Sequence, residues 1–174
     1  MKQSRTLIMN MTFTGCFAAL ICLTTAFILH IPVGNGYIHL GDSLIYLAAW
    51  LLPAPYGLIA AALGGGLADL LCGYTAYVLP TMLIKSLLTV CFYLLGSGRA
   101  QRLRAGKRAI AALACVPVTV IGYWLTAVAL YGNPLAQLLE TVPANLVQAG
   151  GSAAVFLLLA VALERVHFTL PRGN

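Results

Sequence analysis

The chain has 174 residues, of which 61% are hydrophobic and only 8% are charged, and its formal net charge is +6. A soluble domain usually carries about 25% charged residues because its surface must face water, so this composition excludes a soluble globular protein. It predicts an all-α integral membrane protein in which residues 1–174 form a single domain, since six transmembrane helices of about 20 residues would occupy nearly the whole length.

Six apolar segments follow one another along the chain. Their extents predict transmembrane helices at about residues 7–30, 38–53, 56–73, 78–97, 109–131 and 143–165. Proline has no backbone N–H and disfavours helix in the residue before it, so Pro53 and Pro55 predict a sharp turn between the second and third helices. The run Gly132-Asn133-Pro134 predicts the break after the fifth helix.

Most basic residues fall into three clusters, near the N-terminus, between the fourth and fifth helices, and near the C-terminus. The nine residues are Lys2, Arg5, Arg99, Arg102, Arg104, Lys107, Arg108, Arg165 and Arg172. Cytoplasmic loops carry an excess of Lys and Arg, and six spans would bring all three clusters to one side. We therefore expect both termini and the 98–108 loop to be cytoplasmic. Nucleic-acid binding is disfavoured, because no aromatic residues interleave with the basic run.

The second apolar segment is too short to span a membrane if it begins late. If Gly41, Asp42 and Ser43 cap its start, the helix to Leu52 is roughly 15 Å long, whereas the hydrocarbon core is about 30 Å thick. Either the helix begins near Tyr37, or the segment before it, residues 30–41, enters the membrane as irregular backbone. Irregular backbone at that depth must be buried in protein or line a cavity. The glycines, histidines and asparagine of this segment favour a binding loop on the outer face.

Several polar residues lie inside the predicted spans, where they are energetically expensive and indicate functional sites by default. Asp69 and Lys85 lie in consecutive antiparallel helices. They either form a buried salt bridge or face a substrate cavity. Asn145 and Gln148 are three residues apart, which places them on one helix face. They either bind a ligand or join helices by hydrogen bonds.

Aromatic residues gather towards the predicted outer side. They are Tyr37, Tyr74, Tyr77, Tyr123, Trp124 and Tyr131. Those near the ends of spans are typical of the aromatic belt at a membrane interface. Tyr123 and Trp124 lie in the middle of a span, so they either stack on a flat ligand or fill the core.

Enzyme signatures are absent or incomplete. The run Gly41–Leu44 matches the short signature of a hydrolase family with a serine nucleophile. The nearest counterpart of its distant Asp-x-x-His is Glu164–His167, which would lie across the membrane, so no triad can form. We expect Asp42 and Ser43 to cap a helix instead, with Asp42 also available to a ligand. No nucleotide-binding motif occurs, and the five cysteines show no paired spacing, so we expect no cofactor and no metal site.

The run Gly36–Ala49 resembles the first loop and second helix of the substrate-binding S components of energy-coupling factor (ECF) vitamin transporters. Further similarity to this family lies in Gly65–Leu71, Pro80–Lys85 and Pro143–Gln148. The resemblance covers nearly the whole chain, and the riboflavin-type subgroup is the most similar.

This resemblance implies six helices, a ligand pocket near the outer face of a prokaryotic plasma membrane, and docking onto a transmembrane coupling protein driven by two ATPases. It also implies that small residues four apart on the first helix form the docking surface. Gly15 and Ala19 occupy the matching positions, with Ala18 beside them, and glycine stands where the family has its first alanine.

We expect a vitamin or a small heterocyclic precursor as the ligand. The predicted binding residues are Asn35, Tyr37, His39, Asp42, Tyr74, Lys85, Tyr123, Trp124, Asn145 and Gln148. The alternative function is a stand-alone secondary transporter that moves protons through Asp69 and Lys85. A membrane scaffold or an intramembrane enzyme is disfavoured, because the chain lacks a paired nucleophile and base.

Overall fold

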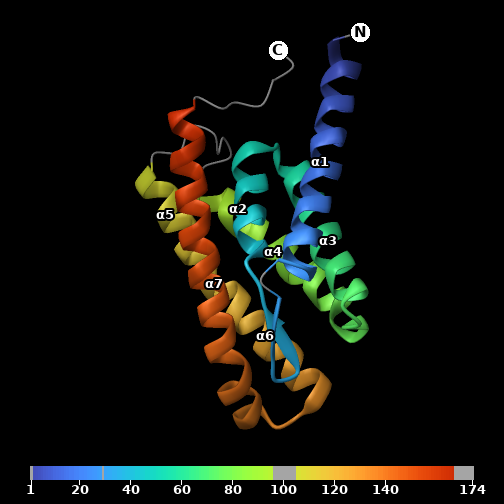
Figure 1. The fold of residues 1–174 in the computed structure, drawn as a ribbon, viewed down its shortest axis with the longest axis vertical. Coiled ribbons are helices and arrows are strands. Elements are labelled where there is room, and N and C mark those ends of the chain that lie inside the picture. Colours follow the sequence, from blue (N-terminus) through green and yellow to red (C-terminus); the bar gives the residue numbers. More distant parts are fainter. Residues whose placement is uncertain (1, 29, 96–104, 167–174) are drawn as a thin grey trace.

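The computed structural model describes residues 2–28, 30–95 and 105–166, which form a bundle of helices with one small β-hairpin (Figure 1). The elements are α1 (Lys2–Ala26), β1 (Ile31–Val33), β2 (Gly36–Ile38), α2 (Gly41–Leu51), α3 (Ala54–Leu71), the 3₁₀ turn η1 (Thr75–Tyr77), α4 (Val78–Leu95), α5 (Ala105–Ala114), α6 (Val116–Tyr131) and α7 (Pro134–Arg165).

Five helical segments in this described part of the chain are long and apolar enough to cross a membrane. They are Gln3–Ala26, Ala54–Leu71, Thr75–Leu95, Ala105–Tyr131 and Pro134–Arg165. The prediction of a helical membrane protein is therefore confirmed, apart from the hairpin. Six spans and the orientation of the termini stay predictions, because α2 has only 11 residues.

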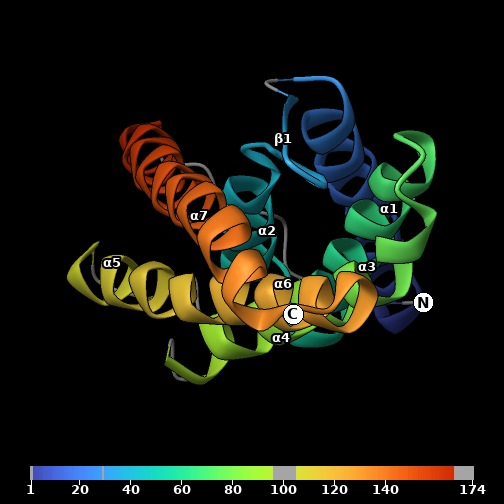
Figure 2. The ribbon, with the colours of Figure 1, turned by 90° about the horizontal axis from the view of Figure 1, so that it is seen from below.

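The helices surround α2, which lies at the centre of the bundle (Figures 1 and 2). α1 packs against α3, α3 against α4, and α6 against α7. α1 begins and α7 finishes at one end of the molecule, which we call the terminal end (Figure 1). The hairpin and the turn between α6 and α7 lie towards the other end, which we call the hairpin end.

The start of α2 decides between the two alternatives for the second apolar segment. The helix begins at Gly41 rather than near residue 38, and ten of its 11 residues are buried. The backbone before it is an ordered antiparallel hairpin, with Ile31 opposite Ile38 and Val33 opposite Gly36. The late start was therefore the correct alternative, but the sequence analysis did not predict the strands.

The prediction that Asp42 and Ser43 cap the start of α2 is wrong. The N-cap residue is Leu40, and no side chain caps the helix there. Ser43 Oγ donates instead to the carbonyl of Leu40 at 2.7 Å. The carboxylate of Asp42 points to Lys85, as described below.

Small residues allow close packing of α3 against α1. A Cβ atom added at Gly64 would lie 2.8 Å from the carbonyl oxygen of Ala18 in α1, closer than real Cβ atoms approach. Ala18 is therefore part of the α1–α3 contact and is buried, which contradicts its expected place on a free docking surface. Gly15 and Ala19 are exposed on α1.

Prolines shift two of the predicted helices. The expected helix at 109–131 is two helices, α5 and α6, which begin at Ala105 and break at Cys115. Pro117 explains the break, because its ring clashes with the carbonyl four residues earlier. α7 begins at Pro134 instead of residue 143 and continues through Pro143. The side-chain oxygen of Asn133 accepts the backbone N–H of Ala136 at 3.2 Å, which caps the helix.

The other boundaries differ by a few residues. α1 runs from Lys2 to Ala26 rather than over 7–30, and the predicted turn at Pro53 separates α2 from α3. The last residues of the expected 78–97 helix and most of the predicted 98–108 loop lie outside the described residues. All five cysteines are free thiols.

The half of α2 nearer the terminal end packs into an aromatic core. The ring centroids of Tyr46, Phe92 and Phe156 lie 5.5–5.8 Å apart. Close by, the guanidinium of Arg108 lies 4.8 Å from the ring centre of Trp50 and donates to Glu164 at 2.6 Å. Side chains fill this region, and none of these residues lines the cavity described below.

Candidate ligand-binding site

A cavity opens between the hairpin and the helices at the hairpin end. The volume of this cavity is about 60 Å³. Its lining residues come from α1, both strands and the turns beside them, α3, η1, α4, α6 and α7. They are Thr25, Val33, Asn35, Gly36, Tyr37, His39, Asp69, Tyr74, Tyr77, Thr81, Tyr123, Glu140, Thr141, Ala144, Asn145 and Gln148.

Hydrogen bonds hold the hairpin over this cavity. The hydroxyl of Tyr37 in β2 donates to Asp69 Oδ1 in α3 at 2.6 Å. At the hairpin turn, the backbone N–H of Asn35 donates to Glu140 Oε1 in α7 at 2.9 Å. The hairpin is thus fastened to helices on both sides, so it forms the roof of the cavity.

Aromatic rings form one wall beneath the roof. The ring of Tyr37 stacks on His30 with centroids 4.1 Å apart, and it lies 4.9 Å from the ring of Tyr74. The hydroxyl of Tyr74 donates to the carbonyl of Gly36 at 3.3 Å. Flat apolar walls with a few polar groups are typical of small-molecule sites.

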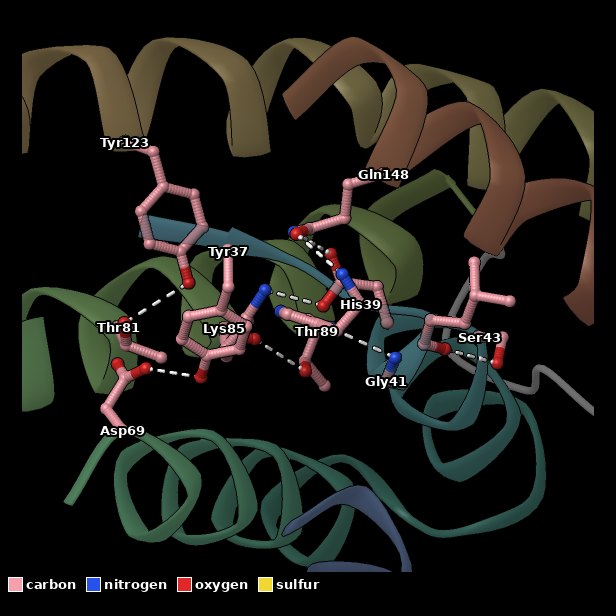
Figure 3. Close-up of polar contacts among 12 residues, drawn as sticks. Tyr37, His39, Gly41, Ser43, Asp69, Thr81, Lys85, Thr89, Tyr123 and Gln148 are labelled. Carbon is pink, nitrogen blue, oxygen red and sulfur yellow. Dashed lines mark hydrogen bonds and ion pairs between the residues drawn. The ribbon is translucent and has the colours of Figure 1, made fainter. Parts of the chain in front are cut away.

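A buried ion pair lies behind the floor of the cavity (Figure 3). Lys85 Nζ lies 2.5 Å from Asp42 Oδ1, and the two side chains are 1% and 0% exposed. Gln148 Nε2 donates to Asp42 Oδ2 at 3.5 Å, while its Oε1 accepts the backbone N–H of His39 at 3.3 Å. Lys85 Nζ also lies 5.0 Å from the ring centre of Tyr123. Groups from α2, α4, α6 and α7 therefore meet at one point.

His39 takes part in the floor as a neutral imidazole. Its Nδ1 accepts the backbone N–H of Gly41 at 3.0 Å, so the ring proton lies on Nε2. Because Nδ1 carries no proton, the ring is uncharged and can donate one hydrogen bond.

The predicted binding residues are divided by the structure into three groups. Seven line the cavity: Asn35, Tyr37, His39, Tyr74, Tyr123, Asn145 and Gln148. Asp42 and Lys85 lie behind this lining and contact it through Gln148 and Tyr123. Trp124 does not line the cavity, because its Nε1 donates to the carbonyl of Pro134 at 3.1 Å.

The interpretation of Asp69 and Lys85 as a salt bridge is wrong. Lys85 pairs with Asp42, and Asp69 accepts from Tyr37 instead. Sequence reasoning joined the two charges on neighbouring long helices. It could not see that the short α2 inserts its first turn beside α4.

Several lining residues were missing from the predicted set. They are Thr25, Val33, Gly36, Tyr77, Thr81, Glu140, Thr141 and Ala144, together with Asp69, which was considered but not included. A signal for the α7 residues was present in the sequence. Had the helix been started at Pro134, the positions 137, 141, 144 and 148 would have fallen on one helical face. Within the described ranges, no cluster of three His, Cys, Asp or Glu residues could hold a metal ion.

Comparison with protein families identifies the family of this chain. A family model described as the S component of the ECF-type riboflavin transporter matches residues 5–165. A search of curated proteins found no match. The family consists of substrate-binding transporter subunits rather than enzymes, in agreement with a bundle of apolar helices around a small cavity. Because the match extends over nearly its entire length, the chain belongs to the S components of ECF-type riboflavin transporters.

Proposed function

We propose that this subunit captures a vitamin or a small heterocyclic precursor in the cavity beneath the hairpin. A coupling protein in the membrane and two ATPases would then drive its release into the cell. The observation that carries this proposal is the cavity itself, where polar groups from the hairpin and five helices converge beside aromatic walls. The absence of a nucleotide-binding motif from the sequence agrees with ATPases on separate chains.

The lining supports a compact, flat ligand. Tyr74 and Tyr123 offer ring faces, while Asn145 and Gln148 offer amide groups from α7. Each polar group of a buried ligand left without a partner costs roughly 1–3 kcal/mol, so these amides favour a heterocycle with its own polar atoms. We propose that the predicted residues that line the cavity, with Asp42 and Lys85 behind them, make up the binding site.

We further propose six crossings of a prokaryotic plasma membrane, with the hairpin end outside. α1 leads from the terminal end to the hairpin end, and α3 does so again, so α2 and the hairpin together must bring the chain back between them (Figure 1). Three exposed basic residues lie on helices that begin or finish at the terminal end: Arg5, Lys107 and Arg165. Cytoplasmic loops favour such basic residues.

Labelling with a membrane-impermeant thiol reagent tests this topology in a variant whose five native cysteines are replaced. A cysteine at Asn35 should react from outside intact cells, and one at Lys107 should react only after the membrane is opened. The reverse pattern would contradict the proposed orientation.

The exposed small residues of α1 are the proposed docking surface for the coupling protein. Gly15→Leu or Ala19→Leu should prevent assembly of the transporter, because close approach of two helices requires small side chains. Cys16→Leu is the matched control, since Cys16 is also exposed on α1. Loss of ligand binding with assembly intact would show that this face serves the cavity instead.

Reconstitution distinguishes the proposal from the alternative of a proton-coupled secondary transporter. In liposomes, uptake of radiolabelled vitamins should require the coupling protein, both ATPases and ATP. Uptake by this chain alone, driven only by a pH gradient, would overturn the proposal and favour proton movement through Asp69 and Lys85.

A further inference from the structure

The distribution of carboxylates indicates what kind of ligand the cavity accepts. The sequence contains only four Asp and Glu residues against ten Lys and Arg. Two of the four are neutralised by basic partners: Asp42 binds Lys85 at 2.5 Å, and Glu164 binds Arg108 at 2.6 Å. The other two form no ion pair with any residue in the described ranges, and both of them line the cavity.

The first of these, Asp69, lies deep inside the cavity and is only 4% exposed. Its Oδ1 accepts the hydroxyl of Tyr37, whereas its Oδ2 is buried and has no hydrogen-bond partner within residues 2–28, 30–95 and 105–166. In Figure 3 no dashed line reaches this second oxygen, which lies beside Thr81. A buried acceptor without a donor is costly, so this oxygen is available to a donor from a ligand.

The second carboxylate, Glu140, lies at the mouth of the cavity. Its Oε1 accepts the backbone N–H of Asn35 in the hairpin turn, which is not a charged partner. Glu140 therefore adds a second negative charge to the same space as Asp69. Although the chain as a whole is basic, with a formal net charge of +6, both acidic residues that lack a basic partner in the described ranges line this cavity.

The one lysine near the cavity does not cancel this charge. Lys85 is 1% exposed and is paired with Asp42, which is fully buried. The pair is neutral as a unit. Donors for a ligand acceptor remain on His39, whose Nε2 carries the ring proton, and on the amides of Asn145 and Gln148. The site thus combines two unneutralised carboxylates with a few neutral donors.

We propose that the ligand is a heterocycle bearing an amino group or a cationic nitrogen, and that Asp69 Oδ2 accepts a hydrogen bond from this nitrogen. Glu140 adds favourable charge at the mouth, and the neutral donors bind an acceptor atom of the ring. This inference rests on the proposed function of a substrate-binding subunit. It excludes phosphorylated and carboxylate-bearing vitamins, and it places neutral flavins below amino heterocycles in affinity.

Binding measurements on matched pairs of compounds test the inference. The wild-type protein in lipid nanodiscs is titrated with pyridoxamine and pyridoxine, with cytosine and uracil, and with riboflavin as a neutral reference. In the first two pairs an amino group replaces an oxygen on one ring system. Hydrogen bonds to charged groups contribute about 1.5–3 kcal/mol, so the amino member of a pair that binds should be favoured about tenfold to a hundredfold.

Isosteric variants assign the preference to its residues. Asp69→Asn keeps an acceptor for Tyr37 and should remove most of the preference for the amino compound. Glu140→Gln keeps an acceptor for Asn35 and should reduce it less. Glu164→Gln removes the same charge at the terminal end, away from the cavity, and should leave the preference unchanged. Circular dichroism and melting temperature check that each variant is folded.

Each outcome bears on a different claim. Equal or tighter binding of the oxygen-bearing compounds or of riboflavin overturns the inference but leaves a vitamin-binding subunit in place. A preference that survives Asp69→Asn also overturns it. If no compound of the panel binds but the chain still assembles with a coupling protein and ATPases, the inference fails alone. If neither binding nor assembly occurs, the proposed function fails as well.

Discussion

The two ends of α2 lie in contrasting surroundings, although both are buried. Its first turn supplies Asp42 to an ion pair beneath a cavity, while its last turns place Trp50 in a closed aromatic core. The ion pair nearest the hairpin end, Lys85–Asp42, is almost wholly buried. In the pair at the terminal end, Arg108 is buried as well, but Glu164 is 49% exposed.

This difference shows where the molecule accepts unfavourable burial. Removing two charges from water is expensive, and a well-packed apolar pair is often at least as stable. Only the hairpin end buries both members of its ion pair, and it does so next to a cavity. At the terminal end one member of the pair, Glu164, remains half exposed, and the interior is packed with aromatic rings. We infer that the polar groups of the hairpin end are retained for a ligand rather than for stability.

The largest expected effect comes from neutralising one carboxylate at each end. Asp42→Asn should leave the positive charge of Lys85 buried without compensation and destabilise the fold by about 3–5 kcal/mol. Glu164→Gln should destabilise it less, because the Glu164 carboxylate is half exposed and water screens its attraction to Arg108. Melting temperatures in detergent measure both variants. Equal shifts would remove the distinction between the two ends.

A smaller effect is expected at the hairpin turn. Gly34 has a φ of +56°, and a Cβ atom there would overlap the carboxylate of Glu140. Gly73 also has positive φ, at +83°, but its added Cβ would meet nothing within 4 Å. Both alanine variants should incur backbone strain of about 1–2 kcal/mol. Only Gly34→Ala should also displace the turn.

Hydrogen exchange followed by mass spectrometry measures that displacement without any ligand. In Gly34→Ala, peptides covering residues 31–38 should exchange faster than in the wild type, because the bond from Asn35 to Glu140 is disturbed. In Gly73→Ala they should exchange as in the wild type. Faster exchange in both variants would mean that the roof responds to strain anywhere at this end.

Composition and charge were enough to predict a helical membrane protein, because both depend on totals along the chain. The prolines at 53 and 134 also marked true boundaries. Pro143 misled, since proline at a helix start and proline inside a helix differ only in whether neighbouring groups satisfy the freed carbonyl. Which groups lie near that carbonyl depends on the tertiary structure, so the local sequence does not contain this information.

The candidate site was also only partly predictable, because the sequence shows which residues are unusual but not which of them meet in the fold. Polar residues at unfavourable depths, such as Gln148 and Lys85, were singled out correctly as unusual. Their partners were not, because the pairing of Lys85 depends on where α2 begins. Trp124 shows the limit of reasoning from position along a span. It is next to Tyr123 in sequence, but its side chain donates a hydrogen bond to Pro134, the first residue of α7.

Native mass spectrometry tests most directly whether the cavity at the hairpin end is the ligand site. Ala144 lines the cavity, and Ala129 is exposed on the surface of α6. Wild type and Ala129→Phe, purified from cells and released from nanodiscs, should carry the mass of one small heterocycle. Ala144→Phe should be folded but empty, because the ring fills the space. Retention of the same compound by Ala144→Phe, or its loss from Ala129→Phe alone, would contradict this account.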